Sequence, residues 1–369
     1  MLLTHLFDTW LPTPLIPGCG AGPACLGRVG ILSTWFRWDA GFFEGIAYKG
    51  YAHVTYTSFY PGYPILLRAG SLLLGERALS VMVVTSLCAL AAFLAIGWLA
   101  ATEIGPSAGR LALLALAAYP FTFFTYAPYS ESLELAFVAL ALLGARRRWW
   151  WLAALGSFGA VVTRLTGALV SVVVLWELVR AYRETPQLRP RPREIAAQAA
   201  ALLAGPVGFL SFLGFLWLKF GDPLIGLKTE RTDWGRGLTN PISTARSVIE
   251  YLPTVLHGTQ VGTVFGVDLV ALLLFVIVPI ALWRKLPPSL TVYSLLVVLA
   301  SILAAAPGGV PGGTDPLISD GRYLLVSIPV FLGLGLLIDR RPALVALLPI
   351  GFLLQGAFAV MYMNWNWVG

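Results

Sequence analysis

Ten apolar stretches limit what this chain can fold into. They cover residues 78–101, 110–127, 131–145, 149–163, 165–181, 194–219, 265–283, 288–306, 323–338 and 343–363. A helix that crosses a bilayer needs about 20 mostly apolar residues, and several of these stretches reach that length. Only 12% of the residues are charged, against about 25% in soluble proteins. The sequence therefore predicts an all-α polytopic membrane protein with about 10 transmembrane helices.

Lysine and arginine indicate the orientation of this bundle. When the connections are assigned alternately to two sides, one side carries thirteen basic and five acidic residues, and the other twelve basic and thirteen acidic. Basic residues accumulate on cytoplasmic loops, so the first side is predicted to be cytoplasmic. The net charge of +7 follows from this topology and gives no reason to expect a nucleic-acid partner.

This orientation divides the chain into five segments. They are an extracytoplasmic N-terminal segment without a clear first span (1–34), a first extracytoplasmic loop with surface helices (35–77), a six-span core (78–219), an extracytoplasmic loop (220–264) and four C-terminal spans (265–369). Most of the carboxylates and polar loops are predicted to lie on the outer face. We therefore expect the function to reside there.

The segment from Trp35 to Tyr51 combines aromatic residues with charges. From Asp39 onward its apolar residues recur at helical spacing, and Gly50 is a plausible end of the helix. An amphipathic aromatic helix suits a membrane–water boundary. Asp39, with Trp38 beside it and Glu44 five residues on, is interpreted as a general base at that surface. The alternative is that Asp39 only caps the helix.

Two further candidates lie at the outer ends of apolar stretches. Glu131 follows Pro128, Tyr129 and Ser130 and is a candidate substrate or metal contact, while Ser130 suits a helix cap. Arg164 interrupts an apolar stretch, and charge within a membrane is costly and usually functional. It is interpreted either as a phosphate ligand or as a side chain that extends to the outer surface.

Candidates in the later outer loops are Trp234, Arg236 and Arg322. Trp234 and Arg236 belong to a loop of mixed charge that is either merely solvated or closes over a lipid-phosphate headgroup. Arg322 enters a predicted span from outside and is either an interface anchor or a phosphate ligand.

Metal and nucleotide signatures are weak. The three histidines, His5, His53 and His257, form no evident metal cluster, and no nucleotide-binding motif occurs. No cofactor is required, although a divalent metal with Glu131 or Glu44 as ligands would be compatible. Cys19 and Cys25 lie in a predicted outer segment where a disulfide could persist or both thiols could stay free.

Six short motifs, in order over roughly residues 35–335, resemble the PIG-V (GPI mannosyltransferase II-like) family of GT-C glycosyltransferases. They are Trp38-Asp39-Ala40 with Ile46-Ala47-x-x-Gly50-Tyr51, the block from Phe59 to Pro64, the block from Pro128 to Ser132, Thr163-Arg164-x-x-Gly167, Gly221-Asp222-Pro223 with Trp234-Gly235-Arg236, and Gly321-Arg322-Tyr323. Members of that family have a spanning helix before the first motif, which residues 1–34 do not supply.

The resemblance implies a GT-C-like helical bundle with extracytoplasmic juxtamembrane helices. It also implies a multi-pass enzyme, in the plasma membrane of a bacterium or the ER membrane of a eukaryote. Such an enzyme takes a sugar, typically mannose, from a polyprenyl-phosphate donor in the bilayer. Asp39 would then be the base for an acceptor glycan, lipid or protein of unknown identity. The alternative is a transporter or a lipid-carrier flippase, which predicts ionisable residues near mid-bilayer and internal repeats; neither is evident.

Overall fold

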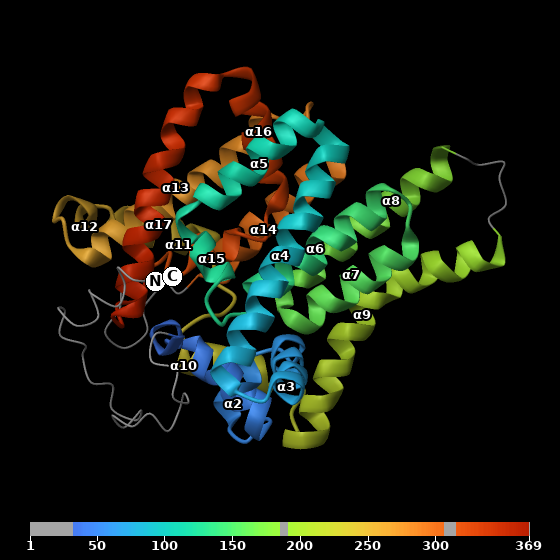
Figure 1. Ribbon diagram of the computed structural model, residues 1–369, viewed down its shortest axis with the longest axis horizontal. Coiled ribbons are helices and arrows are strands. Elements are labelled where there is room, and N and C mark those ends of the chain that lie inside the picture. The colour runs from blue at the N-terminus through green and yellow to red at the C-terminus, as the bar shows by residue number, and fades with distance from the viewer. Residues whose placement is uncertain (1–31, 185–190, 306–314, 369) are drawn as a thin grey trace.

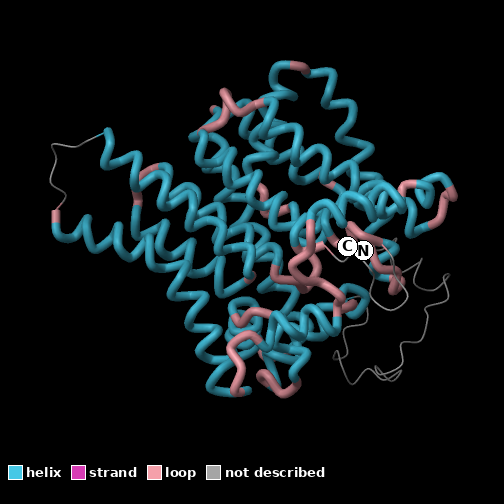
Figure 2. The backbone as a smooth tube through the Cα atoms, turned by 180° about the vertical axis from the view of Figure 1, so that it is seen from behind, coloured by secondary structure: helices cyan, strands magenta, loops and turns pink. Residues whose placement is uncertain are grey.

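The computed structural model describes residues 32–184, 191–305 and 315–368 of the chain. Within these ranges every regular element is a helix and no strand occurs. Figure 2 shows this as helices joined by short connections. The prediction of an all-α protein is confirmed. Cys19 and Cys25, and with them the predicted alternatives of disulfide or free thiols, lie outside the described residues.

The predicted surface helices are present. They are the 3-10 helix η2 (Leu32–Trp35), α2 (Asp39–Lys49), the 3-10 helix η3 (Val54–Ser58) and α3 (Gly62–Leu74). Gly50 ends α2 with a φ of 66°, a left-handed conformation that glycine adopts without strain. Phe43, Ile46 and Ala47 are buried on one face of α2, as their spacing predicts.

The remaining helices account for all ten apolar stretches. They are α4 (Arg77–Ile104), α5 (Pro106–Ala118), η4 (Pro120–Thr125), α6 (Glu131–Arg146), α7 (Trp150–Thr163), η5 (Leu165–Leu169), α8 (Val170–Glu184), α9 (Pro192–Phe220), α10 (Ile225–Asp233), α11 (Pro241–Tyr251), α12 (Pro253–Leu256), α13 (Gln260–Ala281), α14 (Pro288–Leu303), α15 (Asp320–Leu324), α16 (Ile328–Arg340), η6 (Pro342–Leu347) and α17 (Leu348–Met363).

Five helical units among the described residues are long and apolar enough to cross a membrane. These are 77–104, 165–184, 192–220, 260–281 and 342–363. Others, such as α5, α7 and α14, are apolar but shorter. The chain is thus an integral membrane protein, and the count of ten spans stays a prediction.

Proline divides one predicted stretch. The helix expected over 110–127 ends at Ala118, and η4 begins at Pro120. Tyr119 between them is extended, with φ −67° and ψ 131°, because the ring of a following proline disfavours the helical conformation. A single continuous helix over 110–127 was therefore the wrong prediction, and the break places η4 beside the site described below.

Small residues let the central helices pack closely. A Cβ on Gly156 of α7 would lie 2.4 Å from the backbone nitrogen of Ala141, and a Cβ on Gly144 of α6 would lie 2.4 Å from that of Ala153. Helices in membranes associate through such small-residue contacts because the hydrophobic effect does not drive them together. Glycine here brings α6 and α7 into backbone contact and so fixes where Glu131 and Arg164 meet.

The connections predicted to be cytoplasmic gather at one end of the bundle, called here the basic end. Arg146 forms ion pairs with Glu103 at 2.8 Å and with Glu177 at 2.9 Å. Ser107 donates a hydrogen bond to Asp339 at 2.7 Å. These contacts join the ends of α4, α6, α8 and α16 with the start of α5. The helices therefore alternate in direction, as the predicted topology requires.

The opposite end carries the surface helices. Figure 1 shows α2 and α3 side by side at this end, where α10 packs against η3. The start of α3 approaches the end of α7 so closely that a Cβ on Gly62 would lie 2.8 Å from the carbonyl oxygen of Val162. This contact brings the first outer loop against the Arg164 region.

Candidate functional site

Asp39 is the first residue of α2 and faces a buried arginine. Its Oδ2 accepts a hydrogen bond from Nη1 of Arg322 at 3.1 Å. The backbone N–H of Asp39 donates to the hydroxyl of Tyr129 at 3.1 Å. The N-cap position of α2 belongs to Trp38, which makes no side-chain capping hydrogen bond. The alternative that Asp39 only caps the helix is therefore wrong.

Trp38 holds an unusual backbone conformation just before Asp39. Its φ is 53° and its ψ is −120°, which costs free energy for a residue other than glycine. Its ring packs edge-on against Trp365 at 5.7 Å and against Trp367 at 5.2 Å between ring centroids. Packing against the C-terminal segment thus holds the turn that presents Asp39.

Arg322 also faces Glu131, which in turn pairs with Arg164. Nε of Arg322 lies 3.3 Å from Oε1 of Glu131, and Nη1 of Arg164 lies 2.6 Å from the same oxygen. Arg322 and Glu131 are each 3% exposed, so Arg322 is not an interface anchor. Ser130 stands at the N-cap of α6 without a side-chain capping bond.

Arg164 points into the protein rather than to the outer surface. Its Nε lies 3.2 Å from Oε2 of Glu134, a residue that the sequence analysis did not single out. Glu134 is three residues after Glu131 and therefore shares its helix face. This i,i+3 pair of carboxylates at the start of a membrane helix was the available sequence signal.

Tyr323 joins the three predicted phosphate-binding arginines. The guanidinium carbons of Arg236, Arg164 and Arg322 lie 4.3, 4.9 and 5.0 Å from the centroid of its ring. Arg236 also donates to the carbonyl of Ile318 at 2.6 Å. Cations over an aromatic face are held electrostatically, so one ring organises three positive charges that come from distant segments.

Of the two remaining predicted contacts, Trp234 lies at the site and Glu44 does not. Trp234 packs on Phe42 and Phe59, with ring centroids 5.7 and 5.5 Å away, and so covers the outer side of α2. Glu44 does not join the arginines. Five residues along a helix turn it to another face than Asp39, and the charges that influence it are Arg77, Lys49 and Glu76.

Burial sets the proton affinities of three carboxyls outside the membrane-spanning segments. Burial raises the pKa of Asp39, and the Arg322 guanidinium opposes that rise without cancelling it. Burial likewise raises the pKa of Glu230, a residue near Arg236 in the same outer loop. Burial raises the pKa of Glu44 to about 7.

The carboxylates of the site pair with arginines. Among the described residues no group of three or more His, Cys, Asp or Glu side chains could hold an ion. Asp39 and Glu131 instead face arginine, so their negative charge is already compensated. The prediction that no cofactor is required, with a divalent metal compatible, stays untested.

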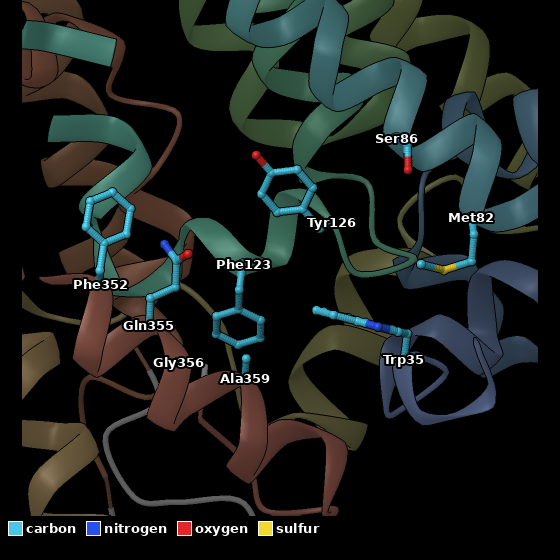
Figure 3. Close-up of a pocket in the computed structure, with 9 residues that line it drawn as sticks. All are labelled: Trp35, Met82, Ser86, Phe123, Tyr126, Phe352, Gln355, Gly356 and Ala359. Carbon is cyan, nitrogen blue, oxygen red and sulfur yellow. The ribbon is translucent and has the colours of Figure 1, made fainter. Parts of the chain in front are cut away.

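An apolar cavity of about 420 Å³ opens beside the site. It is lined by Trp35, Met82, Ser86, Phe123, Tyr126, Phe352, Gln355, Gly356 and Ala359, and Figure 3 shows these side chains between α4, η4 and α17. The carbonyl of Trp35 accepts a hydrogen bond from Tyr362, which also bonds the carbonyl of Arg37. Trp35 of the cavity wall thus lies four residues before Asp39, in a backbone segment that Tyr362 holds by hydrogen bonds.

The C-terminal segment completes the site, a contribution that none of the sequence motifs predicted. The Arg322 guanidinium carbon lies 5.4 Å from the centroid of the Trp367 ring, and that of Arg37 lies 4.6 Å from that of Trp365. Nε of Arg37 donates to the carbonyl of Met363 at 2.8 Å. Clustered tryptophans at the very end of the sequence were the signal for this contribution.

Comparison with solved structures finds this fold elsewhere. ArnT from Cupriavidus metallidurans, in a structure with bound undecaprenyl phosphate, matches with a TM-score of 0.51 and 17% identity. The match covers 89% of this chain and 62% of ArnT, so the chain spans less than two thirds of that protein. The oligosaccharyltransferase of Archaeoglobus fulgidus matches with a TM-score of 0.45 and 13% identity, over 100% of this chain and 53% of that one.

Comparisons of sequence add no family. No protein-family model matches the chain, and no curated protein matches it. At 17% identity the likeness to ArnT concerns the fold alone. The chain is therefore an integral membrane protein with a GT-C-like helical fold.

Proposed function

We propose that the protein is a membrane glycosyltransferase that moves a sugar, mannose by resemblance, from a polyprenyl-phosphate carrier to an acceptor hydroxyl on the extracytoplasmic face. One observation carries this proposal. A largely buried carboxylate, Asp39, forms an ion pair with Arg322, one of three arginines that surround the Tyr323 ring at the end of the bundle opposite the basic end. The GT-C-like fold and the apolar cavity support it.

The chemistry follows as a single displacement. The acceptor oxygen attacks the anomeric carbon and forms the new glycosidic bond, while the bond from that carbon to the carrier phosphate breaks. Asp39 takes the acceptor proton and later returns it to water. Negative charge grows on the leaving phosphate, and preorganised guanidinium groups stabilise it more strongly in the transition state than in the ground state.

Arg322 couples these two tasks. In the structure it is an ion-pair partner of Asp39, and its charge lowers the proton affinity of that carboxyl. A phosphate bound to Arg322 would compete for the same guanidinium, so Asp39 would become a better base when donor is present. The apolar cavity suits the carrier chain, since its lining is mostly aromatic and aliphatic.

The test is sugar transfer from radiolabelled polyprenyl-phosphate-mannose in membranes that carry the wild type, Asp39→Asn or Asp39→Ala at matched expression. General-base catalysis contributes about 10²–10⁴ in rate, so we expect both variants to lose about 100-fold or more. Glu250→Gln is the matched control, because Glu250 is an exposed carboxylate of the outer loop, and it should transfer at the wild-type rate.

Full activity of both Asp39 variants would refute the role of the base. A wild type that transfers mannose from no polyprenyl-phosphate donor, but transfers another sugar, would refute mannose and keep the enzyme class. A wild type that transfers none of a panel of polyprenyl-phosphate sugars would overturn the glycosyltransferase assignment in favour of a transporter.

A further inference from the structure

A second cavity, of about 520 Å³, lies at the basic end, away from Asp39. It is formed where α7 and α9 begin. Its lining consists of Arg148, Trp149, Trp150, Trp151, Leu152, Arg191, Arg193, Glu194 and Ala197. Nothing in the proposed glycosyl transfer uses these residues, so the cavity needs its own explanation.

The lining is strongly positive. It contains three arginines and one carboxylate. Arg148 forms an ion pair with Glu184, but within the described parts of the chain Arg191 and Arg193 have no acidic partner in an ion pair. The cavity therefore holds uncompensated cationic charge, even after Glu194 is counted against one arginine.

The backbone adds to this charge. α7 begins after Trp149 and α9 after Arg191, and neither N-cap residue makes a side-chain capping hydrogen bond. The N-terminus of a helix carries partial positive charge and unpaired N–H groups. Pro192 contributes no N–H, so α7 supplies most of these donors. The two helix ends reinforce the field of the arginines at one place.

The tryptophans indicate the depth of the site in the membrane. Trp149 is 45% exposed and Trp151 is 55% exposed, although both are large apolar residues. Trp149 packs edge-on against Trp98 of α4, with centroids 5.4 Å apart. Tryptophan concentrates at the level of lipid headgroups, where its ring contacts the acyl region and its N–H contacts water.

We propose that this cavity binds the phosphate of an anionic glycerophospholipid from the cytoplasmic leaflet. Arg148, Arg191 and Arg193 would hold the phosphate, and Trp149 and Trp151 would contact the glycerol and the start of the acyl chains. Charge complementarity requires an anion. The exposed apolar side chains that continue from the cavity, Leu155 on α7 and Ile195 on α9, favour a lipid over a free phosphate.

The experiment uses the full-length protein purified in a neutral detergent. A fluorescent phosphatidylglycerol is titrated into the wild type, into Arg191→Gln/Arg193→Gln and into Arg284→Gln/Lys285→Gln, and native mass spectrometry counts bound lipid. Each basic residue near an anionic headgroup strengthens binding about fivefold. The first double variant should therefore bind about 25-fold more weakly, and this loss should shrink at high salt.

The second double variant is the matched control. Arg284 and Lys285 lie in another connection predicted to be cytoplasmic, so their loss removes equal charge and should change affinity less than about threefold. Melting temperatures of both variants show whether each is folded. The proposed glycosyl transfer can fail while this site stands, because the readout is lipid binding alone.

Two results would overturn the proposal. One is equal phosphatidylglycerol affinity of the wild type and Arg191→Gln/Arg193→Gln. The other is displacement of the labelled lipid by glycerol 3-phosphate or inorganic phosphate as effectively as by unlabelled phosphatidylglycerol, which would assign the cavity to a soluble phosphate. Displacement by phosphatidylglycerol but not by phosphatidylcholine would support it.

Discussion

Replacement of Arg322 by glutamine tests the centre of the site, because it separates the structural and the chemical role of one ion pair. Arg322 is 3% exposed and contacts Asp39 at 3.1 Å and Glu131 at 3.3 Å. Glu131 keeps Arg164 at 2.6 Å. The residue that loses its cation is therefore Asp39, whose side chain is 14% exposed.

The magnitude follows from this geometry. Removal of one partner of a buried ion pair lowers the free energy of unfolding by about 3–5 kcal/mol. Because Glu131 keeps its ion pair with Arg164, we expect Arg322→Gln to lie at the lower limit, about 3 kcal/mol. At roughly 2 °C per kcal/mol, the melting temperature should fall by about 6 °C. Addition of Asp39→Asn removes the stranded charge and should restore about half of that loss, about 1.5 kcal/mol, because the effects of two residues in contact are not additive.

Activity should behave differently from stability. Arg322→Gln alone should lose about 100-fold in sugar transfer, since one preorganised cation at a developing charge is worth about 10²–10³. The double variant should be more stable than Arg322→Gln and no more active. The assays are thermal unfolding in detergent and transfer from the labelled donor at matched protein.

Either of two outcomes would refute this reasoning. If Asp39→Asn fails to relieve the instability of Arg322→Gln, the ion pair does not hold the two residues together. If Arg322→Gln transfers sugar at the wild-type rate, the arginine neither binds the phosphate nor governs the base.

Three further predictions concern pH and backbone packing. Because burial raises the pKa of Asp39 above its ordinary value of 3.8, transfer should be lost as pH falls through a midpoint above 3.8. An acid limb of kcat/KM with its midpoint at or below 3.8 would contradict this. Burial raises the pKa of Glu44 from 4.5 to about 7, so the stability of the wild type falls as pH rises through that range. Glu44→Gln should therefore melt at a higher temperature than the wild type at pH 8 and at the same temperature at pH 4. Equal melting temperatures at both pH values would show that Glu44 is not buried as a charge. A Cβ on Gly321 would lie 2.1 Å from Phe121 and 2.6 Å from Asp268. Gly321→Ala should therefore lower the free energy of unfolding by about 1–3 kcal/mol and displace Arg322. An unchanged melting temperature and an unchanged rate of sugar transfer would refute the close packing.

Local pattern was enough to predict the membrane class and the helix that begins at Asp39 and stops at Gly50. The length of an apolar stretch and its helical periodicity depend only on residues that are close in sequence, so both can be recognised from the sequence alone. The break at Pro120 is also a local effect, but its consequence for the site appears only when η4 lies beside Phe358 and Tyr362 of α17.

Which side chains meet was decided by the tertiary structure. Arg322 reaches Asp39 across 283 positions, and Trp367 joins them from the end of the chain, whereas Glu44, five positions from Asp39, turns away. The direction of a side chain on its helix is a local property, but the contact of two helices depends on how glycines such as Gly62 and Gly156 let backbones approach. The sequence by itself thus determined that charged residues would gather at one face of a membrane bundle. Helix packing in the tertiary structure determined which of these residues form ion pairs with one another.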